Sequence, residues 1–329
     1  MEYNDIIQPL WVAFNEDIRL SNGPSHITDL MVLTIKSLIP SEKHVGVYID
    51  YKRFNEEMKL WKYYRHGENV SLLNILEGGE PSIYWNRIDD TAYFRLIPIV
   101  LVNKDYSFMQ KETIKNLLFT TGNINTIIEG VLLSKLLYLL LNKEGDLIEK
   151  LKNEIISFSQ VKFIEEYMDY IRVPLNSYPD NFTVTFEKYK IDALNALNFS
   201  HTNNFSILID CLDLIINGNP TNILFGKVVN ALIDNNKIEK YINNNFYEEL
   251  CIYVYNLRKG RINPKALKIK KYYLPNIFEL NVGDKFYHSL LNYAQVVKKD
   301  CIEGKTIVYL NTKSGMYKFR FYNKCWGGK

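Results

Sequence analysis

Apolar residues recur at helical spacing along most of this chain, up to about residue 257. Short polar connections separate the apolar runs, so the pattern predicts an all-α body. The expected helices are Ile6–Phe14, Leu30–Leu38, Tyr51–Tyr64, Val70–Leu76, Asp90–Val102, Lys111–Leu118, Ile124–Leu141, Gly145–Phe158, Gln160–Ile171, Phe186–Asn198, Asn204–Ile216, Ile223–Ile233 and Phe246–Leu257.

The pattern changes after about Arg258. Thr306–Leu310 and Met316–Tyr322 alternate apolar and polar residues on either side of Thr312–Gly315, which predicts a β-hairpin. We therefore expect a helical domain over residues 1–257 and a basic, aromatic α+β appendage over residues 258–329.

Polar residues at several connections predict where helices begin. Ser25 or Thr28 is a suitable N-cap for the second helix, and Asp89 or Asp90 for the helix that contains Pro98. Pro98 should kink that helix or mark its start.

The hexapeptide Asn217–Asn222 separates two apolar runs and predicts a helix–helix corner. Gly218 can adopt a backbone conformation that other residues avoid, and Asn219 is a competent N-cap. Pro220 suits a first helical turn.

Composition places the chain among globular proteins. Of its 329 residues, 47% are hydrophobic and 23% are charged, and the formal net charge is +3. Basic residues such as Lys265–Lys271 and Lys298–Lys299 are interspersed with acidic ones. We therefore interpret the basic stretches as a solvated face and expect no dedicated nucleic-acid surface.

The cysteines and the apolar runs favour a reducing, cytoplasmic compartment. Cys211, Cys251, Cys301 and Cys325 have neither metal-knuckle spacing nor a disulfide framework. The first residues include acids where a signal peptide needs basic residues. The longest apolar run, Ile127–Leu141, is shorter than the roughly 20 residues of a membrane span, so no membrane association is expected.

Several short segments follow one another in a distinctive order: Ser25–Thr28, Trp61, Phe94–Pro98, Thr121-Gly122, Tyr189–Leu194 and Asn217–Asn222. In this order they resemble motifs of the ADP-ribosylglycohydrolase family, the DraG-like all-α hydrolases. The family motifs are Thr-Asp-Asp-Thr at a helix start, a frequent tryptophan, Met-Arg-x-x-Pro, Thr-His, Tyr-x-x-x-Thr-Leu and Gly-Gly-Asp-Thr-Asp-Thr. The resemblance covers roughly Ile6 to Leu257.

This resemblance implies a multi-helix bundle with a groove for ADP-ribose. In the family, aspartates of the first and last motifs hold two Mg²⁺ ions that activate water and orient the ribose. The positions of this chain that would line the groove are Ser25, His26, Ile27, Thr28, Arg95, Thr121, Gly218, Asn219, Thr221 and Asn222.

The departures from the family motifs remove most of the metal ligands. His26 and Ile27 stand in place of the early aspartates, and Asn219 and Thr221 in place of the late ones. Mg²⁺ prefers carboxylate oxygens, so we expect no metal and no other cofactor. Gly122 also replaces the histidine of the Thr-His pair.

The leading expectation is a catalytically inactive member that binds ADP-ribose, an ADP-ribosylated partner or an ADP-ribosylating toxin. One alternative is an active, Mg²⁺-dependent ADP-ribosyl hydrolase whose acidic site is rebuilt from Glu16, His26, Asp29 or Asp89 and Asp90. Another is an unrelated all-α interaction module.

Individual residues of this set also have structural interpretations. Glu16 and Asp29 are the nearest candidate catalytic carboxylates, and Asp89 and Asp90 could be a displaced Asp-Asp-Thr motif or a helix cap. His26 suits a helix start. Arg95 could contact a phosphate or pair with Asp89 or Asp90 inside the fold.

Overall fold

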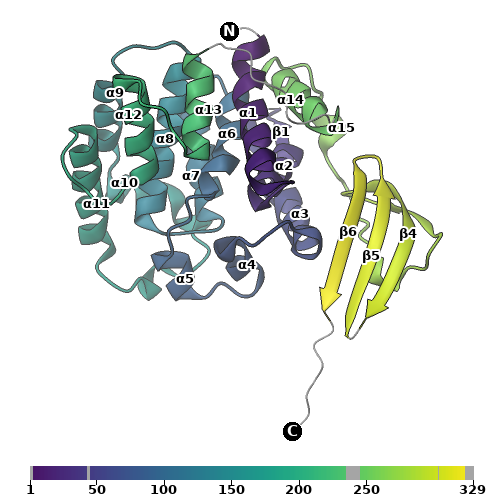
Figure 1. Cartoon of the computed structure of the whole chain (residues 1–329). Helices are drawn as coiled ribbons and strands as arrows, with labels where there is room; N and C mark the ends of the chain where they lie inside the picture. Colours follow the sequence, from purple (N-terminus) through teal and green to yellow (C-terminus); the bar gives the residue numbers. More distant parts are fainter. Residues whose placement is uncertain (1–2, 43–44, 235–244, 303, 323–329) are drawn as a thin grey trace.

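Most of the chain forms a helical body, and a small antiparallel sheet lies beside it (Figure 1). The computed structural model describes residues 3–42, 45–234, 245–302 and 304–322. It is 60% helical, which confirms the expectation of a largely helical fold with a β-containing appendage. The helices of the body are α1 (Tyr3–Ser21), α2 (His26–Ser37), α3 (Tyr51–Tyr64), α4 (Val70–Leu76), α5 (Pro81–Asn86), α6 (Ala92–Val102), α7 (Tyr106–Leu118), α8 (Ile124–Leu141), α9 (Leu147–Ser157), α10 (Gln160–Tyr167), α11 (Phe182–Leu197), α12 (Ser206–Asn217), α13 (Leu224–Ile233) and α14 (Asn245–Arg258).

Several short elements are absent from the expectations based on sequence. Helix α5 follows the glycine-rich loop directly, and a two-stranded sheet follows α2. The strands of this two-stranded sheet are too short to show an alternating pattern. The apolar run from Leu30 therefore predicts helix along its whole length. The remaining short elements are β1 (Leu38–Pro40), β2 (Val47–Ile49), η1 (Met168–Tyr170), η2 (Leu175–Ser177), α15 (Pro264–Leu267) and η3 (Ile277–Glu279).

Helix α8 lies at the centre of the body. Helices α6, α7, α9 and α11 pack around it, and 83% of it is buried inside the fold. By length and composition it is the one helix of the described chain that could cross a membrane. Burial on all sides accounts for its apolar composition.

The predicted caps are confirmed at α2 and wrong at α6. Ser25 precedes α2, and its side chain accepts a hydrogen bond from the Ile27 amide. Thr91 precedes α6 and makes no capping bond, because its hydroxyl donates to the Asp89 carboxylate. Pro98 lies inside α6, which runs uninterrupted from Ala92 to Val102.

The predicted cap at Asn219 is also wrong. Helix α13 begins at Leu224, four residues after Pro220, and Ile223 precedes it without a side-chain cap. The Asn219 amide instead donates to Asp213 on α12. The expected corner does form at Gly218, which ends α12 with a φ of +68°.

The appendage is a four-stranded antiparallel sheet in the order β3-β4-β5-β6. The predicted hairpin is confirmed, since β5 pairs with β6 and Thr312 lies opposite Gly315. Two further strands were not expected, and a register shift between Val296 and Lys298 interrupts the alternation of one of them. The strands are β3 (Lys285–His288), β4 (Asn292–Ile302), β5 (Lys305–Thr312) and β6 (Gly315–Tyr322).

One face of this sheet packs on α3. Phe319 is fully buried, and its ring lies 5.5 Å from the Tyr64 ring of α3, measured between centroids. Tyr317 makes a second edge contact with Tyr64, at 5.0 Å. Aromatic packing therefore attaches the appendage to the body.

His288 is buried where the sheet meets the body, and acid is expected to destabilise this packing. The side chain is 2% exposed, and its Nδ1 accepts the Leu290 amide. Burial, with a smaller effect of Lys36, lowers the pKa of His288 from 6.5 to about 4. Because the pKa is lower in the folded state, stability is lost as the pH falls from the unfolded value towards the folded one.

A His288→Asn variant tests this expectation, since asparagine retains an acceptor but does not titrate. Its melting temperature should fall less than that of the wild type between about pH 7 and about pH 4.5. His201→Asn, at an exposed histidine, is the control. Parallel curves for His288→Asn and the wild type would contradict the assignment.

Candidate functional site

The start of α2 is held by Asp17, a residue of α1 that the sequence analysis did not single out. Its carboxylate accepts hydrogen bonds from the Ser25 hydroxyl at 2.6 Å and amide at 3.1 Å. It also accepts the Thr28 hydroxyl at 2.6 Å and amide at 3.2 Å. Ser25 and Thr28, both expected in a ligand groove, therefore direct their hydroxyl protons at a protein carboxylate.

Asp29 is likewise used inside the protein. It is 7% exposed and accepts the Trp61 indole N–H at 3.0 Å and the His66 amide at 2.8 Å. The His66 ring nitrogen Nδ1 lies 2.9 Å from its other oxygen. Two segments of the family resemblance, the end of Ser25–Thr28 and Trp61, thus meet at the buried Asp29 carboxylate.

His26 and Ile27, which the resemblance aligns with the early family aspartates, contact other parts of the protein. Ile27 packs against the hydrophobic core. The His26 ring lies against Gly67, where an added Cβ would come within 3.2 Å of Nδ1. Gly67 has a φ of +113°, which suits glycine.

Glu16 forms an ionic link between α1 and α13. Its carboxylate contacts Arg19 at 2.8 Å and Lys227 at 2.7 Å. Hydrogen bonding from Arg19, with further contributions from Lys227, lowers the pKa of Glu16 below its usual value of 4.5. The charge is therefore present at neutral pH and compensated by two cations.

The Glu16–Lys227 contact also shows how the Ser25–Thr28 and Asn217–Asn222 segments lie relative to each other. Glu16 is near the end of α1, and Lys227 is in the first turn of α13. Figure 1 shows α1 and α13 beside each other. The Ser25 turn and the Asn217–Asn222 loop consequently lie at the same end of this helix pair.

Two carboxylates of α12, which the sequence analysis did not single out, accept hydrogen bonds from the Asn217–Asn222 segment. Asp210 accepts the Thr221 hydroxyl, and Asp213 accepts the side-chain amides of Asn217 and Asn219. The hydrogen bonds from Asn217 and Asn219 lower the pKa of Asp213. Asn222 is exposed at the end of the loop.

Arg95 and Thr121 are inside the fold. Arg95 is fully buried, and its Nη2 donates to Thr120 at 2.7 Å. Burial lowers its pKa, while the nearby Asp89 charge acts in the opposite direction. Thr121 is also fully buried, and its hydroxyl accepts the Asn123 amide.

Gly122, which the resemblance aligns with the histidine of the Thr-His pair, has no room for a side chain. A Cβ at this position would lie 2.4 Å from the Trp85 ring and 2.5 Å from the Tyr84 ring. The Gly122 amide donates to the Tyr84 carbonyl.

The candidate displaced motif at Asp89 also has protein partners. The Asp89 carboxylate accepts the Asn69 side-chain amide at 3.1 Å and the Thr91 hydroxyl at 2.8 Å. Asp90 is exposed. This pair of acids therefore has one member inside the fold and one in solvent.

The acidic residues near the two motifs do not fit a binuclear magnesium site. The residues that the structure describes contain no group of three His, Cys, Asp or Glu side chains able to hold a metal ion. Hydroxyl, indole and amide protons point at Asp17 and Asp29, where a bound cation would require bare oxygens.

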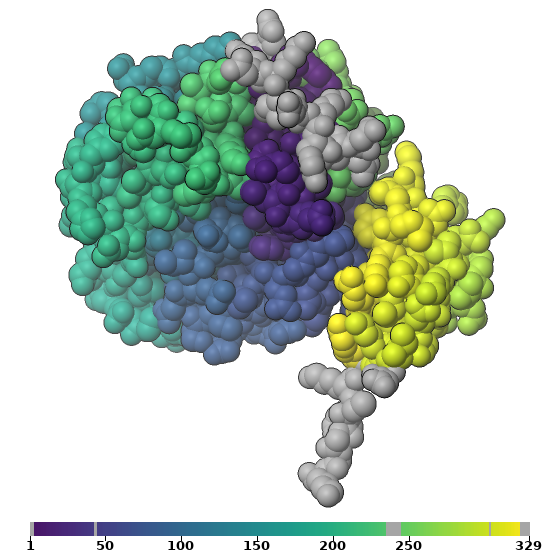
Figure 2. All heavy atoms as spheres, in the orientation of Figure 1, coloured from purple at the N-terminus to yellow at the C-terminus, as the bar shows by residue number. Residues whose placement is uncertain are grey.

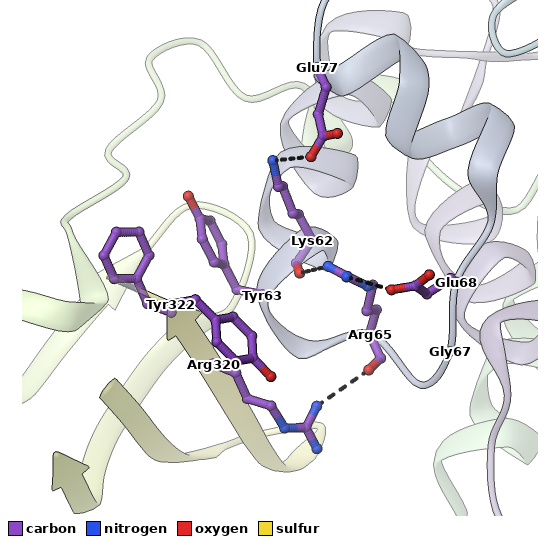
Figure 3. Close-up of a pocket in the computed structure, with 9 residues that line it drawn as sticks. Lys62, Tyr63, Arg65, Gly67, Glu68, Glu77, Arg320 and Tyr322 are labelled. Carbon is purple, nitrogen blue, oxygen red and sulfur yellow. Dashed lines mark hydrogen bonds and ion pairs between the residues drawn. The ribbon is translucent and has the colours of Figure 1, made fainter. Parts of the chain in front are cut away.

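A cavity of about 670 Å³ opens between the helical body and the sheet (Figure 3). Figure 3 shows the side chains of α3, the loop after it and β6 facing one another across it. The lining residues are Lys62, Tyr63, Arg65, Gly67, Glu68, Glu77, Arg320, Phe321 and Tyr322.

Three of these lining residues are basic and two are acidic. Lys62 pairs with Glu77 at 2.8 Å, and Arg65 pairs with Glu68 at 3.2 Å. Arg320 has no carboxylate within ion-pair distance in the described chain, and its guanidinium donates to the Arg65 carbonyl at 3.4 Å. Among the described residues, one positive charge of the cavity thus has no carboxylate partner.

The loop that lines this cavity is bonded to the early motif. His66 contacts Asp29, and Gly67 lies against His26. The sequence contains no local signal for this arrangement, because β6 follows α3 by about 250 residues and the cavity exists only where they meet.

No family model matches this sequence, and no curated protein is significantly similar to it.

Proposed function

We propose that this protein binds ADP-ribose, free or attached to a partner protein, without hydrolysing it, and that the ligand occupies the cavity between α3 and β6. The observation that carries the proposal is Arg320, which has no carboxylate partner among the described residues and lies among the aromatic rings of a cavity of about 670 Å³. This volume lies within the roughly 300–1,000 Å³ typical of small-molecule sites.

The cavity lining suits both the base and the phosphate of a nucleotide-like anion. Tyr63 and Tyr322 present ring surfaces on which a purine can stack. Arg320 offers a planar set of N–H donors suited to a phosphate group. Lys62 and Arg65, although paired with acids, add positive potential on the opposite wall.

The engaged carboxylates favour binding over hydrolysis. Asp17 and Asp29 are occupied by protein donors, and Glu16 by two cations. None of the three is left as a base or a metal ligand at the surface. The resemblance of the sequence motifs to those of ADP-ribosylglycohydrolases suggests ADP-ribose among nucleotide-like anions.

Calorimetric titration with ADP-ribose tests the proposal, with Arg320→Gln as the variant. A charge-assisted contact is worth about 1.5–3 kcal/mol, so the variant should bind roughly tenfold to a hundredfold more weakly. Lys313→Gln makes the same change at the exposed β5–β6 turn and should bind as the wild type does.

Three results would overturn the proposal. The first is equal affinity of the wild type and Arg320→Gln, and the second is no binding by either protein. The third is Mg²⁺-dependent release of ADP-ribose from arginine-modified protein by the purified chain, which would favour an active hydrolase.

A further inference from the structure

The sheet of the appendage has a second face that points away from the body. Strand register places the side chains of this face in cross-strand rows, with β4, β5 and β6 contributing in turn. Lys298 lies opposite Tyr309, which lies opposite Lys318. The opposite face carries Val308, Leu310 and Phe319, which are buried.

Basic and aromatic residues alternate on the outward face. The Lys298 and Lys318 ammonium groups lie 5.3 Å and 5.5 Å from the centre of the Tyr309 ring. Lys305 lies 4.8 Å from the Tyr322 ring. Aromatic rings position these lysines without neutralising their charge.

Acidic residues are scarce on the same face. Among its described residues, Asp300 is the one carboxylate, and it contacts Lys298 at 2.9 Å. The cations of the face are Lys285, Lys298, Lys305 and Lys318, whereas Arg320 of β6 reaches into the cavity and contacts Arg65. The surface is therefore strongly positive although the whole chain has a net charge of only +3.

Aromatic rings on this face are open to solvent. Tyr293 is 79% exposed. Tyr287 stands beside Tyr293, with ring centroids 5.6 Å apart. Figure 2 shows the strands of the appendage forming a separate lobe at the side of the helical body.

We infer that this outward face, defined by Lys298, Lys305, Lys318, Tyr293 and Tyr309, binds single-stranded nucleic acid. Exposed rings provide stacking surfaces for unpaired bases, and the interleaved lysines contact the phosphates. A duplex keeps its bases stacked on one another, so it would leave the rings unused. The charge of the face is complementary to a polyanion.

The even mixture of acids and bases along the sequence conceals this surface. In a strand, successive side chains point to opposite faces, so neighbouring residues separate in space. Lys299, next to Lys298, points inward and donates to the carbonyls of Phe278 and Leu280. The expectation of no nucleic-acid surface rests on the mixture of acidic and basic residues along the sequence. Strand geometry separates neighbouring residues onto opposite faces, so that mixture does not describe either face.

Fluorescence anisotropy with labelled oligo-uridine and oligo-thymidine tests this inference on the full chain. Lys298→Gln/Lys318→Gln should weaken binding about tenfold or more and lower the salt slope by about 1.4, since each single-strand phosphate contact contributes about 0.7. Tyr293→Ser should weaken binding without changing the slope. Lys265→Gln/Lys270→Gln, at exposed positions outside the sheet, is the matched control.

The inference is overturned if the wild type does not bind either oligonucleotide, if the two double variants bind equally, or if a poly-glutamate peptide binds more tightly than the oligonucleotides. Thermal melting of each variant checks that the sheet remains folded. ADP-ribose titration of Lys298→Gln/Lys318→Gln separates this surface from the cavity, because that variant should retain the affinity of the wild type.

Discussion

Replacement of Glu129 by leucine is expected to lower the free energy of unfolding by about 3–5 kcal/mol, since it leaves several buried donors without an acceptor. Glu129 is on the central helix α8 and is 3% exposed. Its carboxylate accepts the amides of Ile207 and Leu208, both at 3.0 Å, and the Tyr93 hydroxyl at 2.8 Å.

The position of these donors explains why the loss should be large. Ile207 and Leu208 belong to the first turn of α12, whose preceding residue, Phe205, provides no side-chain cap. Phe205 has a φ of +61°, a left-handed conformation that is costly for an aromatic residue. Glu129 therefore caps α12 from another helix, and its removal frees both amides within the core.

Glu129→Gln is the informative companion variant. Glutamine keeps the acceptor for the two amides, so the expected loss at neutral pH is about 1 kcal/mol or less. Burial, the largest influence, raises the pKa of Glu129 above 4.5. Because the pKa is raised in the folded state, the stabilising contribution of Glu129 is lost as the pH rises through that pKa. The difference in free energy of unfolding between the wild type and Glu129→Gln should therefore be smaller at neutral pH than in acid.

Urea denaturation followed by circular dichroism measures these differences. Glu149→Gln, at an exposed glutamate of α9, is the control and should stay within about 0.5 kcal/mol of the wild type. A loss below about 1 kcal/mol for Glu129→Leu would show that α12 does not depend on this cap.

Asp17→Ala is the second variant with a large expected effect, a loss of about 3–4 kcal/mol in the free energy of unfolding. The reason is that Asp17, which is 3% exposed, receives hydroxyl and amide protons from both Ser25 and Thr28. Alanine would leave two amides at the start of α2 unsatisfied and free the turn after α1.

Asp17→Asn separates geometry from charge. One oxygen of Asp17 accepts both amides and the Thr28 hydroxyl, whereas the other accepts the Ser25 hydroxyl alone. An asparagine can place its oxygen at the first position and donate from its nitrogen to Ser25. We therefore expect a loss of about 1 kcal/mol, well below that of alanine.

Glu16→Gln, at the neighbouring acid, is the control for the two Asp17 variants. Urea denaturation again measures the free energy of unfolding of all three. Glu16 makes partly exposed ion pairs, which are worth about 0–1 kcal/mol. If Asp17→Ala proved no more destabilising than Glu16→Gln, the helix start would not depend on Asp17.

The sequence predicts the helical body well because most helices are long and bury one face or, for α8, all faces. Ser25 could be identified as a cap because its hydroxyl and the Ile27 amide that donates to it are only two residues apart. Asn219 satisfied the same local rule, yet α13 starts at Leu224. There the side chain of Asp213, on the preceding helix, offers a competing partner.

The candidate site was less accessible to sequence reasoning. Asp29 was identified as a nearby carboxylate, but its partners Trp61 and His66 are more than 30 residues away. Asp17 and Glu129 also accept hydrogen bonds from other elements, and no nearby sequence pattern indicates this role. An isolated acid in an apolar run indicates a buried partner without identifying it.

By itself, the sequence of this protein determined the largely helical class, the hairpin of the appendage and the cap at Ser25. These features depend on residues a few positions apart, whose interactions follow from helical and strand periodicity. The tertiary structure decided which carboxylates are occupied, where the cavity lies and which charges share the outward face of the sheet. Those properties depend on contacts between distant segments, such as Glu129 with α12 and β6 with α3, which local patterns do not encode.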